Sequence, residues 1–183
     1  MKGKSQKGFT LIELIVVFTV LAILSTIGVI SFVSYSRAQV LNQATNDLVQ
    51  ALNTAKSLSA SQLKTVNKNG KTLECLDYQT LNGYGVQINA SDTSHEYYAL
   101  YISCTGNGVN APETTDPLWQ TPLPQNVSFD TTDTVATNIA DVFFPVLSGG
   151  TTTKGNDNAD SIVLTSYGST RTIRIINGYI SVQ

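Results

Sequence analysis

The chain starts with an apolar stretch that carries no charge. Residues 14–36 form a run of 23 consecutive positions without a charged side chain. As a helix rising 1.5 Å per residue, this run would be roughly 35 Å long, which is enough to cross a bilayer. Lysines precede the run, whereas the first basic residue after it is Arg37. The pattern predicts a transmembrane helix with a cytoplasmic N-terminus and an external C-terminal part.

A one-sided apolar stripe follows the uncharged run. Its members recur at spacings of three and four, or multiples of them, with polar residues between: Leu41, Ala44, Leu48, Ala51, Leu52, Ala55 and Leu63. No proline occurs from Phe9 to Leu63, so one helix over residues 9–63 is expected, with its transmembrane part at about residues 9–36. The stripe does not keep strict heptads, so packing against the chain's own β-domain is favoured over a coiled coil.

The remainder, residues 64–183, has the alternation and turn signals of a β-rich domain. Strands are predicted at 84–89, 96–103, 126–130, 139–146, 160–166, 170–176 and 179–182. Asn177-Gly178 indicates a two-residue hairpin turn, because both central residues of a type I′ turn need positive φ. Together with the turn at residues 167–169 it predicts a three-stranded meander at the end of the chain. The predicted fold class is α+β, a long N-terminal helix packed on a small antiparallel β-sheet domain.

Charge and motif content exclude several functions. The formal net charge is −2, and without the three lysines before residue 8 the chain would have 8 basic and 13 acidic side chains, a net charge of −5. An acidic surface disfavours nonspecific nucleic-acid binding. The single histidine, His95, has no nucleophile elbow or nucleotide-binding glycine motif to accompany it. We therefore expect a protein that is not an enzyme and that needs no cofactor.

Residues 7–13 read KGFTLIE directly before the apolar run. This segment closely resembles the class III signal of type IV pilins and type II secretion pseudopilins. The resemblance implies a leader peptide at residues 1–8, cleavage between Gly8 and Phe9 by a prepilin peptidase, and N-methylation of Phe9. It also implies a structural subunit with a pilin-like fold, held in the inner membrane with a periplasmic or extracellular domain before it joins a pilus or pseudopilus. The implied partners are membrane lipid, the inner-membrane assembly platform and other pilin-like subunits that pack against the N-terminal helix.

Glu13 places a carboxylate within an otherwise apolar helix. Burying such a charge without a partner costs about 2 to 3 kcal/mol or more. In the family that the leader resembles, this acid meets the N-terminal amine of a neighbouring subunit, which implies that Glu13 sets the register of assembly. The alternative is that Glu13 lies among lipid headgroups and caps the first helical turn.

Three later segments resemble the GspH/FimT group of minor pseudopilins and minor pilins. They are a proline-led strand at 123–129, a Phe-x-Pro strand at 142–146 and a hairpin at 172–178. This resemblance implies a minor pilin or minor pseudopilin. The glycines at 149–150 come later than in that group and a threonine-rich insertion follows them, so its loop geometry does not transfer.

Cys75 and Cys104 lie in the part expected outside the membrane, where a disulfide can form and persist. The bridge would close a loop of about 30 residues and add roughly 3 to 4 kcal/mol of stability on the chain-entropy model. A pair of buried free thiols is the alternative.

Two further sets of polar residues are weak site candidates. Asp157 and Asp160 lie in the segment GNDNAD, which offers oxygen ligands for calcium, although a polar turn between strands explains the same residues. Arg171 and Arg174 could form a small basic strip for DNA, although a solvated charged face explains them as well. The strip underlies an alternative function as a DNA-binding minor pilin of a DNA-uptake system.

Overall fold

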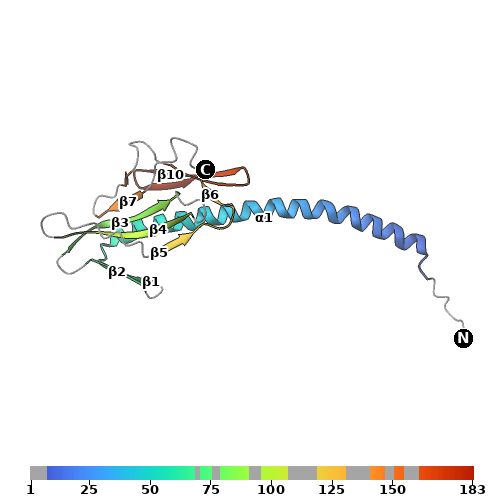
Figure 1. Cartoon of the computed structure of the whole chain (residues 1–183), viewed down its shortest axis with the longest axis horizontal. Helices are drawn as coiled ribbons and strands as arrows, with labels where there is room; N and C mark the ends of the chain where they lie inside the picture. Colours follow the sequence, from blue (N-terminus) through green and yellow to red (C-terminus); the bar gives the residue numbers. More distant parts are fainter. Residues whose placement is uncertain are drawn as a thin grey trace, which may run out of the picture. The chain divides into compact units, whose positions relative to one another are not determined.

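The computed structural model describes residues 8–68, 71–75, 79–90, 96–106, 119–130, 141–146, 151–154 and 161–183 (Figure 1). The chain divides into two compact units, here called the N-terminal unit (residues 1–38) and the globular unit (residues 39–183). One helix, α1 (Leu11–Ser61), contributes residues to both. Each unit is described by itself.

Local signals define both ends of α1. The backbone N–H of Glu13 donates to Thr10 Oγ1 at 3.3 Å, so Thr10 is the N-cap residue at the spacing of a capping box. At the other end Gln62 has a φ of 53°, a left-handed conformation that ends helices. The helix therefore starts at Leu11 and stops at Ser61, two residues inside each end of the predicted range 9–63.

The N-terminal unit presents apolar side chains to its surroundings. From Phe9 to Leu24 the large hydrophobic side chains are 47% to 83% exposed. In the part of the chain that the structure describes, no helix is long and apolar enough to span a membrane. The structure therefore does not support the predicted transmembrane segment.

The globular unit contains two antiparallel sheets and a separate hairpin. The five-stranded sheet has the order β5-β4-β3-β7-β8, with β3 (Gln79–Asn89), β4 (Tyr97–Gly106), β5 (Trp119–Pro122), β7 (Asp141–Pro145) and β8 (Thr152–Lys154). The four-stranded sheet has the order β11-β10-β9-β6, with β6 (Ser128–Phe129), β9 (Ser161–Ser166), β10 (Ser169–Ile176) and β11 (Tyr179–Val182). The hairpin pairs β1 (Thr65–Lys68) with β2 (Lys71–Glu74).

The predicted α+β class and the C-terminal meander are confirmed. Strands β9, β10 and β11 pair in sequence order, and positive φ angles occur at Tyr167, Gly168, Asn177 and Gly178 in the two turns. Strands β1, β2, β5 and β8 were not predicted. Their sequences are short and polar or carry proline, so they lack the alternation that marks a half-buried strand.

The second part of α1 completes the core of the globular unit, and Figure 1 shows strands of both sheets gathered along it. Five members of the predicted stripe are buried with side chains of both sheets: Leu41, Ala44, Leu48, Leu52 and Ala55. Ala51 is only partly buried and Leu63 is exposed, because Leu63 lies beyond the end of the helix.

Polar contacts fix the register between α1 and β10. Arg171 Nε donates to Asn42 Oδ1 at 3.0 Å, and Lys56 Nζ donates to the carbonyl of Gly178 at 2.9 Å. The helix rises about 21 Å from Asn42 to Lys56. The segment from Arg171 to Gly178 spans about 23 Å. β10 therefore runs beside α1 in the same direction with nearly the same rise.

Tyr84 makes the stability of this core sensitive to alkaline pH. Its side chain is fully buried, its hydroxyl donates to the carbonyl of Leu63 at 2.6 Å, and burial raises its pKa to about 12. An unfolded tyrosine ionises near pH 10, so between about pH 10 and pH 12 only the unfolded chain releases this proton. Stability should therefore fall as pH rises through that window. Urea unfolding at pH 9 and pH 11 should show a smaller alkaline loss for Tyr84→Phe than for the wild type, whereas the exposed Tyr179→Phe should match the wild type.

Candidate processing and assembly site

The expected cleavage position lies before the first residue of α1. Gly8 and Phe9 are both exposed, and Phe9 is 83% exposed. No neighbouring atom lies within 4 Å of the position that a Cβ of Gly8 would occupy. The peptide bond between them is therefore free of helical hydrogen bonds and open to a peptidase.

Glu13 lies in the first turn of α1, one turn after Phe9. The cap on its backbone N–H is the hydroxyl of Thr10. Within the described residues the Glu13 carboxylate has no hydrogen-bond or ion-pair partner. Sequence reasoning missed Thr10 as the N-cap, although the Thr-x-x-Glu spacing signals it. Because it has no partner among the described residues, the carboxylate of Glu13 is available to one elsewhere.

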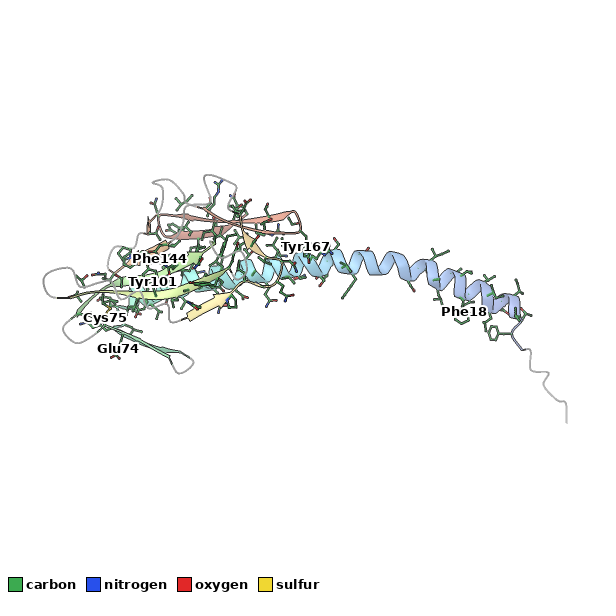
Figure 2. All side chains as sticks on the ribbon, in the orientation of Figure 1. Phe18, Glu74, Cys75, Tyr101, Phe144 and Tyr167 are labelled. Atoms are coloured by element: carbon green, nitrogen blue, oxygen red, sulfur yellow. A yellow bond between two sulfur atoms is a disulfide. The ribbon has the colours of Figure 1, made fainter. Side chains whose placement is uncertain are left out.

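The surroundings of Glu13 are apolar and uncovered within the N-terminal unit. Figure 2 shows the side chains projecting from this part of α1, with Phe18 labelled. Phe18 is 62% exposed and Leu11 is 78% exposed. A continuous apolar surface of this kind marks a contact with other protein or with lipid.

Cys75 and Cys104 are joined by a disulfide with an S–S distance of 2.02 Å. Cys104 lies in β4 and Cys75 follows β2, and both are at most 5% exposed (Figure 2 labels Cys75). The bond ties the end of the β1–β2 hairpin to the five-stranded sheet. Its burial indicates a structural rather than a catalytic disulfide.

The structure does not bring Arg171 and Arg174 together. Arg171 lies on the face of β10 that carries the buried Ile173 and Ile175, and it bonds to Asn42 of α1. Arg174 is exposed and lies on the opposite face of the strand, because side chains alternate along β10. These two arginines therefore do not form the basic strip that the sequence suggested.

The calcium candidates Asp157 and Asp160 lie outside the described part of the chain, and so does the single histidine, His95. Among the residues that are described, no group of three His, Cys, Asp or Glu side chains gathers to hold a metal ion.

A groove on the globular unit was missed at the sequence level. It has a volume of about 220 Å³ and is lined by Asp47, Gln50, Ala51 and Thr54 of α1, Tyr98 and Leu100 of β4, and Thr121 of β5. Burial raises the pKa of Tyr98, and the charge of Asp47 raises it further, while a hydrogen bond with Thr121 lowers it. Tyr98 is therefore neutral at ordinary pH, and Asp47 supplies the negative charge of the groove. Helical spacing relates the four α1 residues, but nothing local in the sequence places β4 and β5 opposite them.

Comparison with known proteins gives a match at the N-terminus of the chain. Residues 3–29 match the family model described as a prokaryotic N-terminal methylation motif. This match confirms the predicted motif, which is consistent with type IV pilins and pseudopilins. No curated protein and no solved structure matches the chain.

Proposed function

Starting from the N-terminal methylation motif at residues 3–29, we propose that the chain is a structural subunit, a minor pilin or minor pseudopilin. A prepilin peptidase removes residues 1–8 and methylates the new amine of Phe9. The subunit then enters a type IV pilus or a type II secretion pseudopilus. The observation that carries the proposal is this motif on a helix with an uncovered apolar surface.

Before assembly, the N-terminal helix anchors the subunit in the inner membrane. The uncharged run at residues 14–36 supports this step, and the lysines before it keep the N-terminus cytoplasmic. The globular unit with its disulfide lies on the oxidising side of that membrane. The assembly platform then transfers the helix from lipid to other pilin-like helices, which cover the same apolar side chains.

Glu13 provides the specific contact in that transfer. Its carboxylate is placed in the first turn, and cleavage creates a positive amine at the same end of a neighbouring helix. Pairing the two charges offsets much of the cost of burying either one alone, and it favours one axial offset between helices. Apolar packing alone would permit several axial offsets.

The minor role is supported by the resemblance of residues 123–129, 142–146 and 172–178 to the GspH/FimT group. Filaments in which this chain is the bulk component would contradict it. We do not propose the DNA-uptake alternative, because Arg171 is engaged by Asn42 and Arg174 lies on the opposite face of β10.

Glu13→Ala should be inserted and cleaved normally but enter filaments at least about tenfold less often. Without the carboxylate, the N-terminal amine of the neighbouring subunit would be buried unpaired. That costs more than the 1.4 kcal/mol that corresponds to a factor of ten. The measurement is quantitative immunoblotting of sheared filaments against membranes. Thr10→Ala is the matched control, because it removes the helix cap and leaves the carboxylate in place. If Glu13→Ala assembled normally, or if only Thr10→Ala failed, the pairing role of Glu13 would be refuted.

A further inference from the structure

Two turns of the C-terminal meander share one backbone conformation but differ in sequence. Tyr167 and Gly168 have φ angles of 49° and 80°, and Asn177 and Gly178 have φ angles of 50° and 81°. Each turn joins two paired residues through a two-residue loop, as in a type I′ turn. Asparagine is common at the first of these left-handed positions, whereas a bulky side chain there is strained. Tyrosine is therefore the less favourable residue for this turn.

The ring of Tyr167 is placed on the surface of the globular unit. Tyr167 is 56% exposed, and residues 168–170 are exposed as well. Residues held in a strained conformation occur mostly where the surrounding structure or a function requires them. An exposed ring with a hydroxyl at its tip suits a partner that is apolar on one side and hydrated on the other.

The turn of Tyr167 lies at the end of the globular unit where α1 enters it. β10 runs beside α1 in the same direction, and Arg171 is level with Asn42. The turn is three to four residues before Arg171, or about 10 to 13 Å nearer that end. Gln39, the first residue of the unit, lies only about 5 Å before Asn42. The turn therefore projects beyond the first residue of the unit, and Figure 2 labels Tyr167 at this end.

Before assembly, this end of the globular unit is next to the membrane surface. The uncharged run ends at Ser36, and Gln39 follows it by three residues, which span at most about 11 Å. The headgroup layer on each side of a bilayer is about 5 to 8 Å thick. Because the turn projects back past Gln39, Tyr167 is within reach of that layer.

The chemistry of the meander suits a lipid surface. Tyrosine and tryptophan concentrate at the boundary between membrane and water, where their amphipathic rings lie at the level of the headgroups. Residues 161–183 contain no acidic side chain, and their charged residues are Arg171 and Arg174. The chain without residues 1–8 has a net charge of −5, so the meander is the part that repels lipid phosphates least.

We propose that Tyr167 binds the lipid headgroups at the outer surface of the inner membrane and holds the globular unit there before assembly. The contact is released when the subunit leaves the membrane for the filament. This inference rests on the proposed function, since the anchored helix brings the globular unit to the membrane. It adds a second membrane contact, outside the N-terminal helix.

Lipid quenching of single tryptophans tests the contact on the full chain in vesicles of phosphatidylcholine and phosphatidylglycerol. Trp119→Phe removes the native tryptophan, and Tyr167→Trp places a probe at the turn. A lipid with a spin label on its headgroup should quench this probe. Tyr179→Trp is the matched control, because Tyr179 is 78% exposed and follows the other turn of the meander, level with Lys56. Its probe should be quenched by acrylamide in the water and not by the labelled lipid.

A third probe separates this inference from the proposed function. Phe18→Trp, also with Trp119→Phe, reports whether the N-terminal helix enters the bilayer, through quenching by a lipid labelled on its acyl chain. Quenching at position 18 without headgroup quenching at position 167, or equal headgroup quenching at positions 167 and 179, would overturn the surface contact alone. No quenching at position 18 would contradict the anchoring step of the proposed function, and this contact with it.

Thiol labelling gives a second measurement that keeps a favourable residue in the turn. The native cysteines are paired, so Ser169→Cys supplies one reactive thiol for a membrane-impermeant maleimide in the same vesicles. Tyr167→Asn removes the ring and matches the residue of the other turn, so it should raise the labelling rate at position 169. Labelling of Ser181→Cys, an exposed position on β11, should be the same with either residue at 167. An unchanged rate at position 169 would overturn the proposal.

Discussion

Gly83→Ala is expected to lower the free energy of unfolding of the globular unit by about 3 kcal/mol or more. A Cβ on residue 83 would fall on the carbonyl oxygen of Phe144 and against the ring of Phe143 and the Cα of Pro145. β3 is paired on both sides, with β4 and with β7, so it cannot move away from this clash. The carbonyl of Phe144 also accepts a hydrogen bond from Ser59 Oγ of α1 at 2.7 Å. Displacing that carbonyl would loosen the helix as well as the sheet.

The matched control for Gly83→Ala is Gly168→Ala. Gly168 lies in the turn between β9 and β10 with a φ of +80° and no atom near its missing Cβ. An alanine there meets only the backbone strain of a left-handed residue, about 1 to 2 kcal/mol. Urea unfolding of the detergent-solubilised chain, followed by circular dichroism, measures both variants. Equal losses at the two positions would contradict the packing argument for Gly83.

Removing the disulfide is expected to have the second large effect. Cys75→Ser with Cys104→Ser opens a cross-link between residues 29 apart in sequence, and the chain-entropy model assigns about 3 to 4 kcal/mol to a loop of that size. The wild-type chain should show the same loss when unfolding is measured in reductant. Adding reductant to the double variant should change nothing further. A double variant as stable as the oxidised wild type would contradict a structural role for the bond.

The features that could be predicted from sequence depend on residues close together in the chain. The processing segment at residues 7–13 is contiguous, and the helix end signals lie within a few residues of each end. The meander of β9, β10 and β11 was also predictable, because Asn177 and Gly178 mark its second turn locally.

The features that were missed depend on contacts between distant segments. β5 is an edge strand whose sequence ends in Pro122, and only its pairing with β4 identifies it as a strand. The opposite faces of Arg171 and Arg174 follow from the alternation of side chains along β10, but the contact of Arg171 with Asn42, 129 residues earlier, joins distant segments. The groove at Asp47 likewise requires α1, β4 and β5 to meet. No window of local sequence contains these relations.

The most direct test of the proposed function is the identity of the mature N-terminus. Intact mass and N-terminal sequencing should be measured on the membrane-extracted protein, expressed with and without a prepilin peptidase. The proposal predicts a peptidase-dependent chain that begins at Phe9 and carries one additional methyl group. A chain that keeps residues 1–8 in the presence of the peptidase, or that is cut beyond Tyr35, would contradict processing and assembly as a pilin-like subunit.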